Sequence, residues 1–246
     1  MNVSARDIRT SGRPMAVFDV DETLIWEKSM FSFLRFFMQS EHGEKTGLDR
    51  YDAFASNLNK LSQTAPREVV NRSFYEVFQD QRMSKLTALA QSWFAQQPVE
   101  KWFIPEVLAT LRVHQQHGHR IVLLSGSALF ILAPLATALA PDDVLAINLG
   151  ETPDGICTGK INGIQTIGAG KLDALRAILL DGGDDPVSSC FGYGDHESDA
   201  PFLDACDAGF VVWHSGAKKR PSWAQRFHPI IINSKPMASL ESYANA

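Results

Sequence analysis

Met15-Ala16-Val17-Phe18-Asp19-Val20-Asp21-Glu22-Thr23 is the stretch that decides the fold of this chain. Its four leading apolar residues predict a short buried strand that ends in two carboxylates, two residues apart. Side chains alternate along a strand, so Asp19 and Asp21 lean to the same side. Ligands in open α/β sheets bind at the carboxyl ends of strands. The stretch therefore predicts an α/β fold in which one acid attacks as a nucleophile and the other transfers protons.

Two further segments place polar groups where a phosphoryl group could bind. The apolar run Ile121–Leu124 is followed by Ser125 and Gly126, a hydroxyl donor and a glycine that lets backbone N–H groups come close. Lys171 opens an amphipathic helix, where a lysine opposes the helix dipole unless an anion lies in front of it. Both segments therefore indicate a bound anion.

A second acid pair, Asp195 and Asp199, follows the strand-like segment 188–193. Taken alone, the first acid pair would also fit a loop of solvated acids or a Ca²⁺-binding turn. The four segments together come in the order acid pair, serine, lysine, acid pair, and this order argues against both of those interpretations.

This order of motifs resembles the haloacid dehalogenase (HAD) superfamily, whose four motifs lie at strand ends in the same succession. Segments 158–161 and 168–171, and the Gly-Asp-x-x-x-Asp pattern at 194–199, are similar to its phosphoserine-phosphatase-like branch, subfamily IB. The match covers most of the chain. It implies a Rossmann-like parallel sheet core at residues 1–25 and 99–246, with an inserted all-helical cap domain at 26–98.

Hydrophobic patterning points to the same α/β architecture. No strand pattern appears between Lys28 and Gln97, whereas strands and helices alternate from Arg120 onward, with a short hairpin at 150–164. The aromatic side chains of the cap segment could line an apolar pocket or form the core of the cap. They are Phe31, Phe33, Phe36, Phe37, Phe74, Tyr75 and Phe78.

The resemblance implies a phosphatase that hydrolyses a small-molecule phosphomonoester through an aspartyl-phosphate intermediate. In that chemistry Asp19 is the nucleophile, and Asp21 protonates the leaving oxygen and then deprotonates water. Ser125, Gly126 and Lys171 hold the phosphoryl oxygens. Asp21 also favours phosphoryl chemistry over dehalogenation, because a halide leaving group needs no proton.

The resemblance also implies a Mg²⁺ cofactor. Its implied ligands are the carboxylates of Asp19 and Asp195 and the backbone carbonyl of Asp21, with Asp199 as a further acid that orders the site. Hard oxygen ligands of this kind suit Mg²⁺. Two alternatives stay open: a phosphotransferase that uses the same intermediate, and a HAD-fold binding protein without catalysis.

Glu27, Lys28 and Ser198 are the candidate substrate-binding residues. Phosphoserine phosphatases carry a glutamate seven residues after the second acid of the first motif, and Lys28 occupies that position here, with Glu27 one residue away. Ser198 stands where an asparagine is usual. These departures predict that phosphoserine is a poor substrate.

Composition indicates a cytoplasmic protein, and the resemblance implies that it acts on a small phosphorylated metabolite. The net charge of −5 argues against a nucleic-acid partner. The longest apolar stretch, 128–140, is too short to span a membrane. The odd number of cysteines, three, favours reduced thiols over a disulfide framework or a zinc site. His114, His117 and His119 are expected to form a solvated helix end, and the sequence leaves the oligomeric state open.

Overall fold

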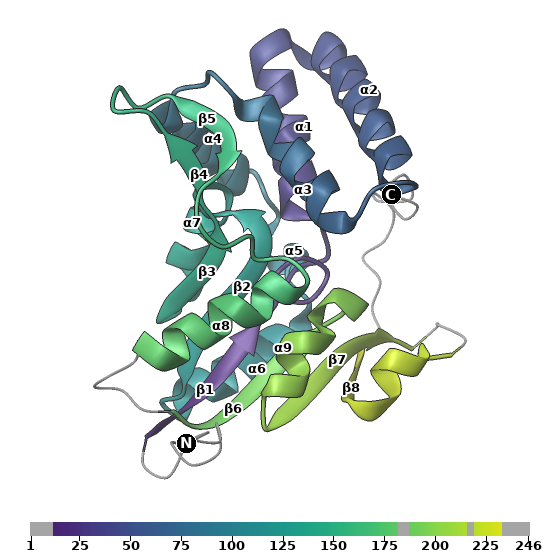
Figure 1. Ribbon diagram of the computed structural model, residues 1–246, viewed down its shortest axis with the longest axis vertical. Coiled ribbons are helices and arrows are strands. Elements are labelled where there is room, and N and C mark those ends of the chain that lie inside the picture. Colours follow the sequence, from purple (N-terminus) through teal and green to yellow (C-terminus); the bar gives the residue numbers. More distant parts are fainter. Residues whose placement is uncertain (1–11, 182–186, 216–218, 233–246) are drawn as a thin grey trace.

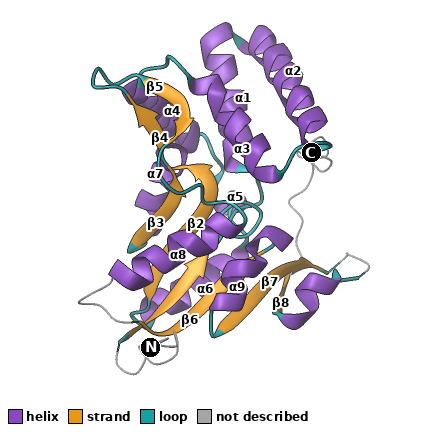
Figure 2. Ribbon diagram, viewed as in Figure 1, coloured by secondary structure: helices purple, strands orange, loops and turns teal. Residues whose placement is uncertain are grey.

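The computed structural model describes residues 12–181, 187–215 and 219–232, and a six-stranded parallel sheet lies at its centre (Figures 1 and 2). The strand order is β3-β2-β1-β6-β7-β8, and every neighbouring pair is parallel. The strands are β1 (Arg13–Phe18), β2 (Arg120–Ala128), β3 (Asp143–Ile147), β6 (Val187–Gly194), β7 (Ala208–His214) and β8 (His228–Ile232). This sheet confirms the predicted α/β class.

Alternation along β1 explains how helices cover both faces of the sheet. Ala16 and Phe18 belong to a hydrophobic cluster with α6 and α7, whereas Met15 and Val17 belong to a second cluster with α8 and α9. These helices are α6 (Pro105–Gln116), α7 (Leu129–Leu139), α8 (Ala169–Asp181) and α9 (Ala200–Ala205). All four β1 residues are fully buried, as expected for a central strand of a parallel sheet.

The register of the sheet brings the predicted motifs to one edge. Phe18 at the end of β1 pairs with Leu123 of β2 on one side and with Tyr193 of β6 on the other. The residues that follow these three positions therefore meet at the carboxyl ends of neighbouring strands. These residues carry the first acid pair, the serine and the second acid pair.

A helical insertion, here defined as α1 to α4, separates β1 from β2 and lies above the sheet in Figure 1. Its elements are α1 (Ser29–His42), α2 (Glu44–Ser62), α3 (Arg67–Tyr75), the short 3-10 helix η1 (Glu76–Phe78) and α4 (Met83–Ala95), and the four-residue α5 (Val99–Trp102) leads back to the sheet. The expected all-helical segment is confirmed, since residues 29–95, all of them described, contain no β-strand. The exact cap boundaries stay a prediction.

Aromatic side chains fill the interior of the helical insertion. Phe33, Phe74 and Phe78 are almost fully buried, and Phe33 and Phe78 both pack against Phe130 of α7, with ring centroids 5.4 and 5.5 Å apart. Phe31 is partly buried and packs against the same cluster. The core of the insertion is therefore continuous with the core on one face of the sheet, which favours the packing interpretation of these aromatics over a pocket lining.

The predicted hairpin is present as β4 (Leu149–Glu151) and β5 (Cys157–Ile161), a separate two-stranded antiparallel sheet. Its backbone bonds to the helical insertion, because the Cys157 N–H donates to the Gln81 carbonyl at 2.8 Å and the Asp80 N–H donates to the Cys157 carbonyl at 2.9 Å. Gly159 has a positive φ of 69°, and a Cβ there would meet Gln79 at 3.0 Å. A glycine is needed at this contact between the hairpin and the insertion.

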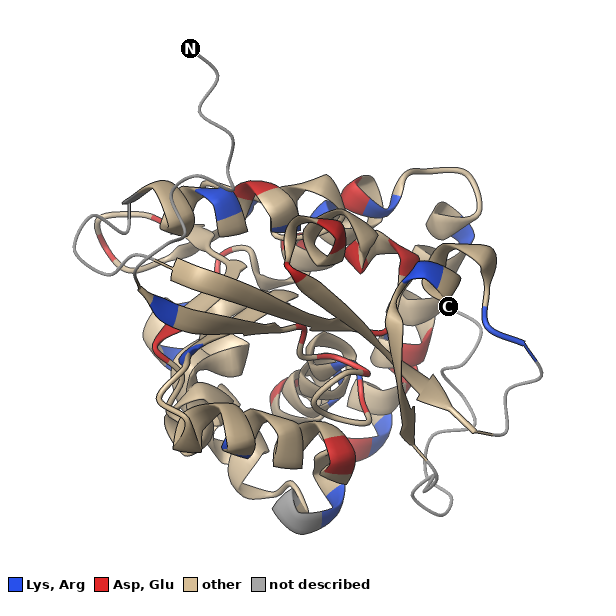
Figure 3. Cartoon of the chain, turned by 90° about the horizontal axis from the view of Figure 1, so that it is seen from below, with Lys and Arg blue, Asp and Glu red and all other residues tan. Residues whose placement is uncertain are grey.

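Few charged residues lie in the strands of the sheet. Figure 3 shows acidic and basic positions interspersed over the helices and loops, while the strands are almost entirely uncharged. Among the described helices, none is both long and apolar enough to cross a membrane. Cys157, Cys190 and Cys206 are free thiols, and the Sγ atoms of Cys190 and Cys206 contact each other.

Candidate active site

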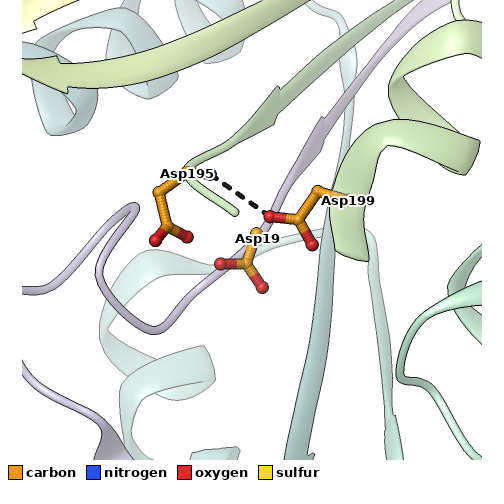
Figure 4. Close-up of side chains that lie close together, drawn as sticks. All are labelled: Asp19, Asp195 and Asp199. Carbon is orange, nitrogen blue, oxygen red and sulfur yellow. Dashed lines mark hydrogen bonds between the residues drawn. The ribbon is translucent and has the colours of Figure 1, made fainter. Parts of the chain in front are cut away.

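Asp19, Asp195 and Asp199 form a carboxylate cluster at the ends of β1 and β6 (Figure 4). Each offers one oxygen atom, and these oxygens lie within 4.8 Å of one another. Asp19 directly follows β1, Asp195 directly follows β6, and Asp199 ends the short turn after β6. The structure thus brings together three acids that are up to 180 residues apart in the chain.

Lys171 in the first turn of α8 joins this cluster. Its Nζ donates hydrogen bonds to Asp19 Oδ1 and to Asp199 Oδ1, both at 2.6 Å, and only 4% of the residue is exposed. The ring of Phe202 lies 5.6 Å from the ammonium group. Burial alone would lower the pKa of Lys171, but the charges of Asp19 and Asp199 outweigh it and raise that pKa. Lys171 therefore carries a fixed positive charge between two acids.

The acids outnumber the lysine that neutralises them. Burial raises the pKa of Asp19 to about 7, Lys171 opposes this shift, and the charges of Asp199 and Asp21 add to it. Burial, followed by the charges of Asp19 and Asp199, raises the pKa of Asp195 well above its usual range. A further cation among these oxygens would stabilise the ionised carboxylates, and a cluster of three carboxylates, all hard oxygen donors, fits Mg²⁺.

Hydrogen bonds fix the orientation of the second acid pair. Asp199 Oδ2 accepts from the backbone N–H groups of Asp195 at 3.2 Å and His196 at 3.1 Å, while its Oδ1 accepts from Lys171. Asp195 Oδ1 accepts from the hydroxyl of Thr23 at 3.0 Å. The sequence pattern assigns Thr23 no role, and in the structure this residue connects the first acid motif with the second.

Asp21 lies beside the cluster with both carboxylate oxygens bonded. Oδ1 accepts from the backbone N–H of Ser29 at 2.9 Å, and Oδ2 accepts from the hydroxyl of Ser127 at 2.7 Å. Neither serine is among the site residues predicted from the sequence. Ser127 could have been found, because it lies two residues after Ser125 on a strand and so faces the same side.

Ser125 and Gly126 lie at the end of β2 under the helical insertion. Ser125 Oγ accepts from the Ser127 N–H at 3.1 Å, and Ser125 is 1% exposed. The Gly126 carbonyl accepts from the Tyr75 hydroxyl at 2.7 Å and from Asn71 Nδ2 at 3.1 Å. Burial, and then the charge of Asp21, raise the pKa of Tyr75 well above its ordinary value, so its phenol stays protonated and donates. Sequence patterns gave no signal for Asn71, and they placed Tyr75 in a pocket lining or in the core of the cap without this contact, since both hydrogen bonds cross from α3 to β2.

The substrate-binding candidates lie at a more exposed edge of the site. Arg67, the first residue of α3, donates from Nη1 to His196 Nδ1 at 2.6 Å and to Ser198 Oγ at 3.1 Å. Partial desolvation, and then the Arg67 charge, lower the pKa of His196 to about 4, so its ring is neutral and can accept. Lys28 Nζ lies 3.7 Å from Glu22 Oε2. Glu27 is partly buried.

The prediction that His114, His117 and His119 form a solvated helix end is wrong for His114. His114 is 8% exposed, and its ring bonds the Tyr193 hydroxyl through Nε2 and His119 through Nδ1, both at 2.7 Å. Helix α6 packs on the sheet through Val107 and Leu111, and His114 follows them on the same helical face. Only His117 of the three is exposed.

Comparison with known proteins agrees with this geometry. A family model described as haloacid dehalogenase-like hydrolase matches residues 16–204. The chain is 26% identical over 236 residues to the "Inhibition of morphological differentiation protein" of Streptomyces azureus, covering 92% of this chain and 80% of that protein. It is also 26% identical over 239 residues to a "Probable phosphatase" of Mycobacterium tuberculosis, covering 92% of this chain and 77% of that protein.

The fold is similar to that of a solved phosphoserine phosphatase, whose structure is described as a phospho-aspartyl intermediate analogue. The TM-score is 0.61 at 15% sequence identity, over 92% of this chain and 95% of that one. At this identity the likeness establishes the fold, a Rossmann-like α/β core with a cap of the phosphoserine-phosphatase type.

Proposed function

The chain belongs to the haloacid dehalogenase-like hydrolase family, and on that premise we propose that it is a Mg²⁺-dependent phosphatase for a small phosphomonoester. One observation carries the proposal: the buried Lys171 donates hydrogen bonds to Asp19 and Asp199, both at 2.6 Å. Asp195 lies in the same carboxylate cluster, and Asp21 follows Asp19 by two residues in the sequence. A nucleophile, a proton donor, a fixed cation and an oxygen-rich cation site are thus within reach of one bound phosphoryl group.

The first half-reaction transfers the phosphoryl group to the protein. An Asp19 carboxylate oxygen attacks phosphorus, the bond from phosphorus to the substrate oxygen breaks, and the proton of Asp21 passes to that oxygen. The products are the free alcohol and an aspartyl-phosphate on Asp19. Lys171, the Ser125 hydroxyl and the Gly126 N–H stabilise the charge that spreads over the phosphoryl oxygens.

The second half-reaction restores the enzyme. The Asp21 carboxylate takes a proton from water, the water oxygen attacks phosphorus, and the bond to Asp19 breaks with release of inorganic phosphate. Bound Mg²⁺, held by the carboxylates of Asp19 and Asp195 and the Asp21 carbonyl, would supply positive charge where two anions meet. Asp199 keeps Lys171 and the Asp195 backbone in place for both steps.

The proposal extends to the chemical class of the substrate and to the cellular compartment of the enzyme. Lys28 and Arg67 at the exposed edge favour a second anionic or a neutral hydroxyl group on the substrate over an ammonium group. Three free thiols fit a reducing compartment, so we expect the enzyme to act on a cytoplasmic metabolite.

The test is phosphate release from p-nitrophenyl phosphate and from a panel of sugar, polyol and amino-alcohol phosphates. We expect turnover with Mg²⁺, loss of turnover in excess EDTA, and recovery when Mg²⁺ is restored. Asp173→Asn, a change to an exposed acid on α8, is the matched control and should retain full activity. Full activity in EDTA, or no hydrolysis of any phosphomonoester with Mg²⁺, would contradict the proposal.

A further inference from the structure

Two buried serines outside the family motifs hold Asp21. Ser127 Oγ donates to Asp21 Oδ2 at 2.7 Å, and Ser29 Oγ donates to Ser127 Oγ at 2.8 Å. Both serines are 0% exposed. A hydroxyl has one hydrogen, and because Ser127 receives the hydrogen of Ser29, its own hydrogen is directed to the carboxylate. The chain of donors therefore has one direction, from Ser29 through Ser127 to Asp21.

The backbone of the same two residues completes the arrangement. Ser29 is the first residue of α1, and its N–H, which has no partner within the helix, donates to Asp21 Oδ1 at 2.9 Å. The Ser127 N–H donates to the hydroxyl oxygen of Ser125 at 3.1 Å. Ser127 thus touches both the acid proposed to transfer protons and the serine proposed to hold phosphate.

These contacts hold Asp21 through both of its carboxylate oxygens. Two donors from different elements fix the plane of the carboxylate, one from α1 and one from β2, and each oxygen keeps a second lone pair for a proton in transit. Buried hydroxyls must find acceptors, and the acceptor of the Ser127 hydroxyl is Asp21, the proposed catalytic acid, and not a neighbouring carbonyl. We infer that Ser127, supported by Ser29, is a positioning residue that aims Asp21 at the leaving oxygen.

The inference rests on the proposed phosphatase function and predicts a dependence on the leaving group. An alkoxide leaving from a polyol phosphate needs the Asp21 proton as the bond to phosphorus breaks, whereas p-nitrophenolate is a stable anion that leaves without it. Misplacing Asp21 should therefore slow alkyl phosphates more than p-nitrophenyl phosphate. The effect belongs in kcat/KM, which includes the step in which the leaving group departs.

The experiment compares Ser127→Ala with wild type on p-nitrophenyl phosphate and on the alkyl phosphate that wild type hydrolyses fastest. We expect kcat/KM for the alkyl phosphate to fall about tenfold more than that for p-nitrophenyl phosphate. Ser29→Ala keeps the backbone donor and should move the ratio in the same direction by less. Ser92→Ala, at an exposed position of α4, should leave the ratio unchanged.

The outcomes separate this inference from the proposed function. If wild type is active and Ser127→Ala slows both substrates equally, Ser127 is structural and the inference is wrong. If wild type hydrolyses no phosphomonoester, the proposed function fails and the inference fails with it. Thermal unfolding identifies any variant that does not fold, and if Ser127→Ala does not fold, Ser29→Ala decides: an unchanged substrate ratio in that variant overturns the inference.

Discussion

The strand-end site and the helical insertion hold their functional residues in opposite ways. At the strand ends, ionised groups are buried and bonded to one another, as in the two 2.6 Å contacts of Lys171 with Asp19 and Asp199. The insertion instead has an aromatic interior that packs against Phe130 of α7, and hydrogen bonds also join it to β2 and to the segment before α8. Examples are the Tyr75 hydroxyl on the Gly126 carbonyl and Arg72 on Gln165 at 2.8 Å.

Under the proposed function, this difference would separate the residues of the reaction chemistry from those that select the substrate. The buried charges are costly to disturb, because removing one partner leaves another charge unpaired in the interior. The contacts of Arg67 and Arg72 in the insertion are exposed, and each can be altered with little effect on the fold. We therefore expect variants at the strand ends to abolish turnover, and variants at the insertion to change which substrate is turned over.

The largest effect is expected for Asp19→Asn. An amide cannot form the aspartyl-phosphate, so kcat should fall by about 10³-fold or more while the fold is retained. Steady-state phosphate release and thermal unfolding measure the two quantities, with Asp173→Asn as the control. Turnover close to wild type in a folded Asp19→Asn protein would show that the strand-end acid is not the nucleophile.

A smaller effect is expected at the insertion, for Arg67→Ala. Arg67 bonds His196 and Ser198, the residues between Asp195 and Asp199, so its loss should loosen the insertion over the site. We predict a rise of about tenfold in KM, or about 1.4 kcal/mol, with a smaller change in kcat. Arg72→Ala, which loses only the contact with Gln165, is the matched control. Equal KM values for the two variants would refute a special role for Arg67.

A ranking of phosphomonoesters by kcat/KM tests whether Lys28 takes part in substrate selection. Phosphoserine should have a kcat/KM several-fold below the best phosphomonoester, because the charge of Lys28 repels its ammonium group, although partial exposure weakens that repulsion. Lys28→Glu should raise the relative rate with phosphoserine, and Lys60→Glu, at an exposed position of α2, should not. If phosphoserine heads the wild-type ranking, Glu27 performs the recognition and the assignment to Lys28 is wrong.

The smallest effect concerns His114, a buried titratable group that takes no part in the proposed chemistry. Burial, followed by the charges of His119 and His117, lowers the pKa of His114 to about 4. The unfolded chain binds this proton near pH 6.5 while the folded chain does not, so the contribution to stability is complete above pH 6.5 and is lost as pH falls toward 4. The Tyr193 hydroxyl also faces the ring and stays protonated throughout this range.

Denaturant unfolding between pH 7 and pH 4 measures this contribution. His114→Gln should flatten the decline in the free energy of unfolding, whereas His117→Gln, at an exposed position, should follow wild type. A decline in His114→Gln as steep as that of wild type would mean that other groups carry the acid sensitivity.

Sequence patterns predicted those features of the fold that follow from the order and periodicity of neighbouring residues. The parallel sheet, the helical segment between the first two core strands, and the hairpin all follow from periodicity and turn residues. The acids of the carboxylate cluster could be expected to meet because the carboxyl ends of parallel strands share one edge. Strand β8 was not among the strands expected from the sequence, and Pro229 within it is tolerated because β8 lies at the edge of the sheet.

The remaining features depend on contacts between distant elements, which no local pattern encodes. Ser29 meets Ser127 across 98 residues, and Tyr75 meets Gly126 across 51. His114 looked like part of a polar helix end, yet its position on the packed face of α6 buries it against Tyr193. Because no sequence pattern shows such contacts, the sequence pointed to a class of chemistry but not to a substrate.

The most direct test of the central claim is to identify the phosphorylated residue during turnover. The enzyme would be mixed with Mg²⁺ and its best substrate, quenched in acid within a single turnover, and digested with pepsin for mass spectrometry. The mechanism predicts that the peptide containing Asp19 gains one phosphoryl group, and that Asp19→Asn does not. A phosphoryl group on another residue, or product formation with an unmodified Asp19 peptide at every time point, would contradict the aspartyl-phosphate mechanism.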